Sequence, residues 1–327
     1  PRVLPERSNR TAMDSCTLSV LFPVRNIEQE IGAILRLTAE QTQGINTEFI
    51  VADMGSTDKT VWEALRAIKE LRLSGSVLQS GEGTVARALN TAMVRAAGEY
   101  VSFVFARRLY SAFLAPYCEM AHMLHSDIVF GTAGEPFGKE GTIMPGSVCL
   151  QGLLEEKLPV DIAAVLLRRA FLEERRLIFA ENCEFGYSEE FLLRCFCTAE
   201  TAVRSPVALR RDSAYELRRG PQKTVGAASF QRVEALLRVT EYVESRLPGD
   251  KKVSALLWER RIPQAVMWCV DLLLREGNGY GAVQGMLKVG GYRKYLKCGS
   301  ATPFELKKRI RLWKSLPWMY KPRRPVP

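Results

Sequence analysis

Two apolar patterns alternate along the first third of the chain, and this alternation limits the fold more than any other feature of the sequence. Short runs rich in β-branched residues, at 18–24 and 49–52, are each followed by a segment whose apolar residues recur at helical spacing, such as Val61, Leu65 and Ile68. Such runs are typical of buried strands, and such spacing is typical of helices. Further strands are expected at 77–78, 100–105 and 127–130. The sequence therefore predicts a doubly wound α/β domain with a mostly parallel sheet and a ligand site at the carboxyl ends of its strands.

Long helical periodicities replace this alternation from about residue 230 onwards. A chain of 327 residues also exceeds what one average domain needs. We therefore expect a flexible arm at 1–14, an α/β domain at 15–222 and a helical, basic C-terminal extension at 223–327.

The net charge of +10 arises largely at the C-terminus, where 306–324 carries Lys and Arg residues but no acidic residue. Interleaved with these charges are Trp313, Leu316, Trp318, Met319 and Tyr320. A cationic segment with aromatic residues suits an anionic membrane surface. The alternative is a basic tail helix that packs on the α/β domain. No nucleic-acid-binding module is recognisable, so no nucleic acid is expected as a partner.

Cysteine usage and the N-terminal sequence bear on the compartment. The eight cysteines lack paired-ligand spacing apart from Cys195 and Cys197, which we expect to pack as free thiols on a helix. His122 and His125 lie three residues apart but have no further metal ligands nearby. No secretory signal and no apolar run long enough to cross a bilayer is recognisable. These features predict a cytoplasmic protein that lies, at most, peripherally on the inner face of the plasma membrane.

Five segments of the α/β part carry a more specific signal. They are LSVLFPVRN at 18–26, FIVADMGSTDKT at 49–60, SGEGTVARALNTAMVRAAGEYVSFVF at 80–105, FLEERRLIFAENCEFGYSEEFLLRCF at 171–196 and VRSPVALRRDSAYELRRGPQKT at 203–224. In their order and content they resemble the family 2 glycosyltransferases of the A-type fold, which have a Rossmann-like sheet with flanking helices. The resemblance implies a nucleotide-sugar donor and a glycan or lipid-linked acceptor.

The first two segments are implied to hold the nucleotide. In the family, the residue matched by Asp53 reads the base, and a carboxylate there can accept the N3–H of uracil. Gly55 permits a tight turn beside it, while Met54 replaces the usual second acid. The alternative is a loop that only caps the helix opening at Asp58. The donor-binding residues implied by these segments are Pro23, Asn26, Asp53, Gly55 and Ser56.

Three further arginines are implied to lie near the donor. Arg87 matches a family position whose guanidinium can contact phosphate or base oxygens, although a solvated helix arginine would look the same. Arg218 and Arg219 match a polar flap that could close over the diphosphate. Arginines on an edge strand also prevent aggregation, which is the alternative for this pair.

The fourth segment holds an acidic pair, Glu189 and Glu190. By the resemblance, Glu190 takes the position of the catalytic base, which deprotonates the acceptor hydroxyl so that the sugar is transferred with inversion. The alternative is a helix-surface ion pair, because Glu190 and Arg194 are four residues apart.

One departure from the family pattern is decisive for function. Where members carry an Asp-x-Asp sequence that holds Mg²⁺ or Mn²⁺ on the donor diphosphate, this chain has Phe105, Ala106, Arg107 and Arg108. The usual metal ligands are missing, so no cofactor is predicted. In one interpretation Arg107 and Arg108 replace the metal and the chain is a metal-independent transferase, acting on a UDP-linked donor. In the other, the chain is a catalytically degenerate binding or scaffold protein in polysaccharide assembly.

Overall fold

The computed structural model describes residues 17–131, 141–212 and 225–323, which form two compact units. The first unit comprises Pro1–Asn182 and Thr198–Gly220, and the second comprises Cys183–Cys197 and Pro221–Pro327. The expected arm at 1–14 and the expected boundary at 222 lie outside the described residues. The second unit also takes in residues 183–197, which we had assigned to the α/β domain.

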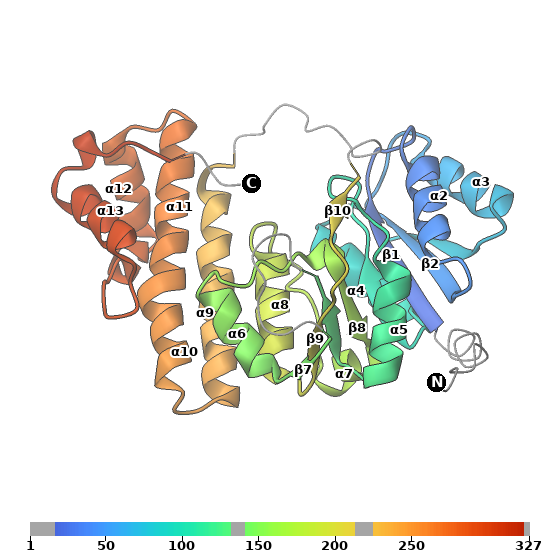
Figure 1. Cartoon of the computed structure of the whole chain (residues 1–327). Coiled ribbons are helices and arrows are strands. Elements are labelled where there is room, and N and C mark those ends of the chain that lie inside the picture. The colour runs from blue at the N-terminus through green and yellow to red at the C-terminus, as the bar shows by residue number, and fades with distance from the viewer. Residues whose placement is uncertain (1–16, 132–140, 213–224, 324–327) are drawn as a thin grey trace. The chain divides into compact units, whose positions relative to one another are not determined.

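A mixed sheet forms the centre of the first unit (Figure 1). Within the described residues its strand order is β3-β2-β1-β4-β8-β6-β9-β7. β1, β2, β3 and β4 run parallel, whereas β8 is antiparallel to both β4 and β6. The predicted α/β fold is therefore confirmed. The strands are β1 (Thr17–Val24), β2 (Asn46–Asp53), β3 (Ser74–Gln79), β4 (Tyr100–Phe103), β6 (Ile128–Phe130), β7 (Ile143–Met144), β8 (Val165–Arg168) and β9 (Ala202–Arg204).

Helices cover both faces of this sheet because the central strands are apolar on both sides. Leu18, Val20 and Phe22 of β1 pack in one cluster with residues of α2, α3 and α5. On the opposite face, α4 contacts β1 and β2, and Phe103 packs edge-on against Phe179 with ring centroids 5.5 Å apart. The helices of this unit are α2 (Ile31–Gln41), α3 (Thr60–Glu70), α4 (Val85–Arg95), α5 (Leu114–Leu124), α6 (Gly146–Leu154), η1 (Ile162–Ala164) and α7 (Arg169–Glu174).

Gly98 is the first residue of the Gly-Glu-Tyr sequence that leads into β4, and packing requires a glycine there. A Cβ atom at Gly98 would lie 2.6 Å from the backbone nitrogen of Ser19, so no larger residue fits without moving the strand. The Gly98 N–H donates to Ser19 Oγ at 2.8 Å, and Glu48 accepts from the Ala97 N–H at 2.6 Å. These bonds hold β4 beside β1 at the amino end of the sheet, opposite the expected ligand site.

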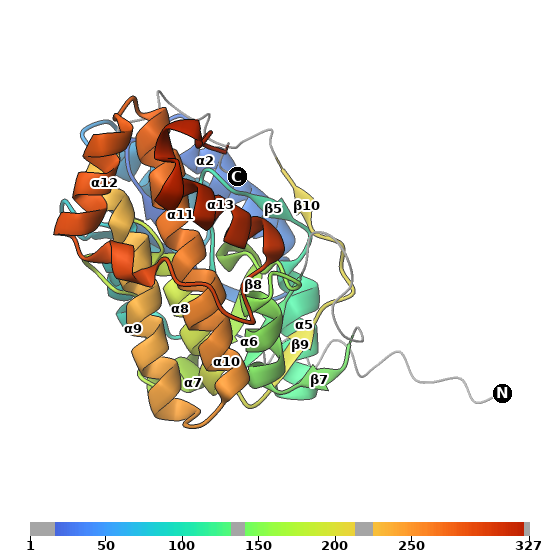
Figure 2. The ribbon, with the colours of Figure 1, turned by 90° about the vertical axis from the view of Figure 1, so that its left-hand side faces the viewer.

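The second unit is helical (Figure 2). Its C-terminal helix is fixed by a buried polar group, in which Arg309 pairs with Asp271 and the Tyr320 hydroxyl donates to Asp271 at 2.5 Å. No helix in the described part of the chain is long and apolar enough to cross a bilayer. The helices are α8 (Tyr187–Thr198), η2 (Gly226–Phe230), α9 (Gln231–Arg246), α10 (Lys251–Leu256), η3 (Leu257–Arg261), α11 (Ile262–Arg275), α12 (Tyr280–Val289), η4 (Tyr292–Tyr295), α13 (Phe304–Ser315) and η5 (Pro317–Met319).

Candidate functional site

Pro23 marks the point at which β1 and β4 part. The register of these strands ends at Leu21 and Phe103, followed by one bond from the Val104 N–H to the Leu21 carbonyl at 2.9 Å. The backbone of Pro23 faces β4, as that of Leu21 does. Because Pro23 has no N–H to donate, the pairing of β1 with β4 stops there. The strand order reverses between β1 and β4, and ligands of doubly wound sheets bind at such a switch point.

Asn26 joins the loop after β1 to the loop after β2. Its backbone is left-handed, with φ of 52°, which asparagine tolerates better than most residues. The Asn26 N–H donates to Ser56 Oγ at 2.9 Å, and the Thr57 N–H donates to Asn26 Oδ1 at 2.8 Å. The Pro-x-x-Asn turn therefore fixes the loop that carries the predicted base-reading residue.

Asp53 ends β2 and organises the loop that follows it. The side chain is nearly buried, and its carboxylate accepts the Gly55 and Ser56 N–H groups, each at 3.1 Å. Gly55 has φ of +75°, and a Cβ there would lie 3.1 Å from the side chain of Glu82. Asp53, Gly55 and Ser56 thus form one turn, and their predicted role in donor binding stays a prediction. The capping alternative also operates, because Asp58 accepts the Thr60 N–H at 2.9 Å where α3 begins.

Arg87 lies in the first turn of α4, just after the glycine turn at Gly81 and Gly83. Thr84 caps this helix by accepting the Arg87 N–H at 3.3 Å. The Arg87 side chain is exposed, and its guanidinium has no hydrogen-bond or ion-pair partner among the described residues.

A tight turn follows β4 and presents the two arginines that replace the Asp-x-Asp acids. The Arg108 N–H donates to the Phe105 carbonyl at 2.9 Å, and both Arg107 and Arg108 are exposed. Arg108 pairs with Asp161 at 2.8 Å, whereas the Arg107 guanidinium has no partner within the described ranges. Tyr110 also donates to Asp161, at 2.8 Å, and burial together with this carboxylate raises the pKa of Tyr110 to about 12.

Two arginines that we did not predict lie beside this turn. β5 (Tyr110–Ser111) pairs with β10 (Arg210–Arg211), and Arg211 donates to the Arg107 carbonyl at 3.4 Å. Arg210 and Arg211 are both exposed. We call Arg107, Arg108, Arg210 and Arg211 the arginine cluster. The adjacent pair in LRRD was visible in the sequence, but nothing local indicated that it would lie against the β4 turn. Arg218 and Arg219 lie outside the described residues.

The residues at the end of β4 do not suit a divalent cation. Mg²⁺ and Mn²⁺ require oxygen ligands, whereas the turn offers guanidinium groups, and the neighbouring Asp161 carboxylate is engaged by Arg108 and Tyr110. In the described part of the chain, no group of three or more His, Cys, Asp or Glu side chains is arranged to hold a metal. The rings of His122 and His125 have centroids 6.4 Å apart, and no such group includes them.

The acidic pair belongs to the second unit, where arginines engage both carboxylates. Glu190 is 1 % exposed and accepts from Arg238 at 2.7 and 3.1 Å and from Arg194 at 2.7 Å. The ion pair with Arg194, which was the alternative to a catalytic role for Glu190, is therefore present, but it is buried and does not lie on the helix surface as expected. Glu189 is held by Arg232 at 3.1 Å and by Arg261. Burial alone would raise the pKa of Glu189, but these two guanidiniums lower it to about 2.

Cys195 and Cys197 are buried free thiols on α8, as expected. Burial raises the pKa of Cys197 to about 11, so its thiol stays protonated and is a poor nucleophile.

Comparisons with known proteins agree with this fold. The family model described as Glycosyl transferase family 2 matches residues 19–104, which span β1 to the end of β4. The crystal structure of S. aureus TarS 1-349 is similar, with 16 % identity and a TM-score of 0.61 over 91 % of this chain and 87 % of that chain. The mannosyltransferase PcManGT from Pyrobaculum calidifontis, in complex with GDP-Man and Mn²⁺, has 17 % identity and a TM-score of 0.52 over 91 % and 85 % of the two chains. Comparison with curated proteins gave no significant match. The match at 19–104 shows that this stretch is similar to the family 2 glycosyltransferases, and the chain shares the A-type fold of these structures.

Proposed function

We propose that this chain is an inverting, metal-independent glycosyltransferase in which the arginine cluster binds the diphosphate of a UDP-linked sugar. The guanidinium of Arg107 at the end of β4 carries the proposal, because it is exposed and has no partner among the described residues. Two guanidiniums nominally supply the charge of one divalent cation, and their fixed donors bind phosphate oxygens bidentately. Because Asp161 neutralises part of the charge of Arg108, we expect Arg107, Arg210 and Arg211 to supply most of the positive field.

The nucleotide preference rests on Asp53 and on the fold. Its carboxylate accepts two backbone N–H groups, and a carboxylate has further lone pairs that can accept the uracil N3–H. TarS 1-349, which shares the fold at 16 % identity and a TM-score of 0.58, has been crystallised in complex with UDP-GlcNAc. Arg87 would add a further contact to the diphosphate or the base. The proposed acceptor is a surface glycan or a lipid-linked glycan.

The proposed chemistry is a single displacement. The acceptor hydroxyl gives its proton to a carboxylate, its oxygen bonds to the anomeric carbon, and the bond from that carbon to the diphosphate breaks with release of UDP. Glu190 stays the predicted base, with Glu189 beside it. In the described arrangement both oxygens of Glu190 accept from guanidiniums, so Arg238 must move away before this carboxylate can take a proton.

This engagement of Glu190 supports a second candidate function, a binding or scaffold protein that keeps the donor pocket but does not catalyse transfer. Glu190→Gln separates the two functions. If the chain is an enzyme with Glu190 as its base, this variant binds UDP-sugar normally and loses turnover. Unchanged turnover would remove Glu190 from the mechanism, and absence of turnover in the unmodified protein with every donor would support the scaffold.

The metal-independent mechanism is tested by measuring UDP release with and without EDTA. We expect release to continue in EDTA, and loss of activity on chelation would contradict the arginine proposal. Arg107→Asp should weaken UDP binding about 100-fold, because two or more charge-assisted contacts of about 1.5 kcal/mol each are lost. The matched control is Arg95→Asp, an exposed arginine in the last turn of α4, at the opposite end of that helix from the site.

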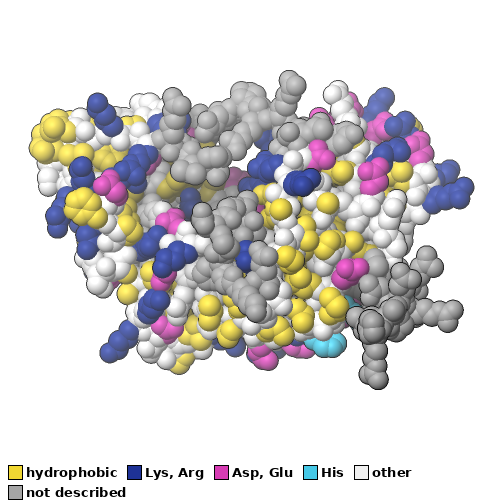
Figure 3. Space-filling model, viewed as in Figure 1, with side chains coloured by type: hydrophobic (Ala, Val, Ile, Leu, Met, Phe, Trp, Pro, Cys, Tyr) yellow, Lys and Arg dark blue, Asp and Glu magenta, His cyan; other side chains and the backbone are white. Residues whose placement is uncertain are grey.

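We further propose that the chain acts in the cytoplasm on the inner face of the plasma membrane. Trp318 and Met319 of η5 are 65 % and 58 % exposed, and Phe304 at the start of α13 is 76 % exposed. Figure 3 shows hydrophobic and basic side chains mixed over the region of α12 and α13. Such a surface suits anionic headgroups. Trp313 and Tyr320, in contrast, are buried within the second unit, where their rings lie edge-on to each other. The alternative, a basic tail helix packed on the α/β domain, stays a prediction.

Sedimentation with vesicles containing phosphatidylserine tests this membrane proposal. The double variant Trp318→Ser and Met319→Ser should lose most of its binding, and Trp62→Ser, which changes an exposed tryptophan of α3, should not. Equal sedimentation of the unmodified protein and both variants would overturn the proposal.

A further inference from the structure

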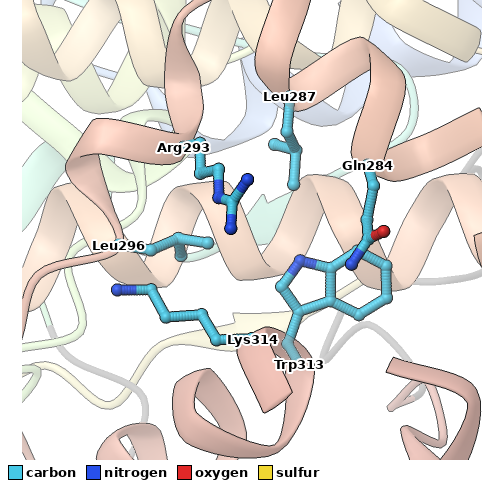
Figure 4. Close-up of a pocket in the computed structure, with 6 residues that line it drawn as sticks. All are labelled: Gln284, Leu287, Arg293, Leu296, Trp313 and Lys314. Atoms are coloured by element: carbon cyan, nitrogen blue, oxygen red, sulfur yellow. The ribbon is translucent and has the colours of Figure 1, made fainter. Parts of the chain in front are cut away.

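A small cavity and a larger open groove lie among the described residues of the second unit. The smaller, drawn in Figure 4, is a cavity of about 30 Å³, which is room for about one water molecule, lined by Gln284, Leu287, Arg293, Leu296, Trp313 and Lys314. The larger is an open groove of about 450 Å³ along α9, α10 and η3. Its volume falls in the range of small-molecule sites. We call it the α9–η3 groove.

A π-helical turn places an aromatic side chain in the wall of this groove. In η3 the Ile262 N–H bonds to the carbonyl of Leu257, five residues back, so the helix contains one extra residue. Leu257 and Ile262 are both fully buried, and the extra residue keeps both on the core side. Trp258 and Glu259 are thereby turned outwards, and Trp258 is 40 % exposed. Such insertions occur often at functional sites.

The polar groups of the groove are held in place by their neighbours. Glu244 accepts from the indole N–H of Trp258 at 2.9 Å and from Ser254 Oγ at 3.3 Å. Glu259 accepts the Ala301 N–H at 2.9 Å, and a Cβ at Gly299 would lie 2.0 Å from the Glu259 carboxyl carbon. A glycine at 299 therefore makes room for this carboxylate. The groove is built before any ligand arrives, which lowers the cost of binding.

The charge of the groove excludes the ligands that suit the first unit. Glu244, Asp250 and Glu259 line it against a single cation, Lys251, in a protein whose net charge is +10. Phosphates and other anions would be repelled. What remains is an aromatic face that is electron-rich, fixed carboxylates that accept hydrogen bonds, and one ammonium donor.

From this combination we infer that the α9–η3 groove binds a neutral saccharide. The C–H groups on one face of a pyranose ring carry partial positive charge and would stack on the indole of Trp258. The sugar hydroxyl groups would donate to Glu244 and Glu259 and accept from Lys251. The inference does not depend on the arginine cluster, since a saccharide could bind here whether or not the chain binds a nucleotide sugar.

Titration calorimetry with the full-length protein tests the inference. The probes are the neutral pentasaccharides of N-acetylglucosamine and of glucose, the cationic pentasaccharide of glucosamine, and inorganic polyphosphate. We expect at least one neutral pentasaccharide to bind with a saturable isotherm. Trp258→Ala should weaken that binding at least tenfold, whereas Trp62→Ala, which removes an exposed tryptophan from the first unit, should leave it unchanged.

Glu244→Gln provides a second variant that keeps the indole and the side-chain volume, in case Trp258→Ala unfolds. Glu244→Gln should also weaken binding of the neutral saccharide at least threefold. The inference is overturned if no neutral probe saturates, if Trp258→Ala and Glu244→Gln bind as the unmodified protein does, or if only the glucosamine probe binds, which would indicate an ammonium site. Arg107→Asp should bind the saccharide normally, so failure of the donor proposal and failure of this one give different results.

Discussion

The arginines of the two units differ in what they face. In the first unit, Arg87 and Arg107 are exposed and have no partner among the described residues. In the second unit, Arg238 donates to the buried carboxylate of Glu190, and Arg232 and Arg261 donate to Glu189. Guanidinium groups that already hold a carboxylate stabilise the fold, whereas those without one are available to a ligand. Around Glu189 and Glu190 positive charge therefore has a structural use, whereas at Arg87 and Arg107 its proposed use is to bind a ligand.

The same contrast applies to the position at the end of β4 where the family pattern has metal-binding carboxylates. An enzyme that relies on Asp-x-Asp needs carboxylates at the end of β4 and a cation between them and the diphosphate. This chain has arginines there, and its buried carboxylates near α8 are fully occupied by arginines. These two features are independent of each other. The arginines at the end of β4 change how a diphosphate could be bound, and the ion pairs on α8 change how a base could act.

The largest expected effect comes from removing a partner in the second unit. Glu190→Ala leaves the guanidiniums of Arg238 and Arg194 without their carboxylate, and breaking a buried pair in this way costs about 3 to 5 kcal/mol of unfolding free energy. Urea denaturation followed by circular dichroism measures it. Arg107→Asp should change the unfolding free energy by less than about 0.5 kcal/mol, because the Arg107 guanidinium is exposed and has no partner in the part of the chain that the structure describes. Equal losses in the two variants would end the distinction between the two sets of arginines.

Acid should weaken the same region through Glu189. Its pKa is about 2 in the folded protein and 4.5 in the unfolded chain, so the stabilisation is complete above about pH 4.5 and is lost as the pH falls towards 2. The loss amounts to at most about 3 kcal/mol. Unfolding free energies measured between pH 6 and pH 3 should fall in the unmodified protein and fall less in Glu189→Gln. Glu241→Gln, an exposed glutamate of α9, is the control and should follow the unmodified protein.

The first unit allows a test by restoration. Phe105→Asp with Arg107→Asp recreates the Asp-x-Asp spacing at the end of β4. Without metal, this double variant should bind UDP about 100-fold more weakly, and Mn²⁺ should recover at least tenfold of the loss. Calorimetry with and without Mn²⁺ measures both effects. If Mn²⁺ strengthened binding to the unmodified protein by the same factor, the arginines would not be substitutes for the metal.

The fold could be predicted well wherever a pattern is long and local. The apolar runs at 18–24 and 49–52 correspond to β1 and β2, and the helical spacing after 60 corresponds to α3. The short strands β7 and β8 were not expected, because they are two and four residues long and their partners β9, β6 and β4 are distant in sequence. Periodicity records burial within a segment and contains no information about which distant segment covers it.

The same limit applies to the site. Residues close together in the chain, such as Asp53, Gly55 and Ser56, could be assigned together because one turn holds them. The partner of Arg108 could not, since Asp161 lies 53 residues away in a region without a family motif. Arg238 likewise meets Glu190 from 48 residues away. Ion pairs depend on tertiary closeness, so sequence spacing predicted only the pair between Glu190 and Arg194 on one helix.

The smallest effect is expected at Asp53, and it tests whether a carboxylate can serve its own loop and a ligand at once. Asp53→Asn keeps one oxygen to accept the Gly55 or Ser56 N–H, so the loop should hold, but the charge that would strengthen the bond to uracil is lost. UDP binding should weaken about tenfold, which corresponds to about 1.4 kcal/mol. Asp250→Asn should not affect UDP binding, because it changes an aspartate of the second unit that caps α10. Because the loss falls on the base, cytidine and uridine diphosphates should become harder to distinguish, and an equal loss for both nucleotides would mean that Asp53 supports the loop without reading the base.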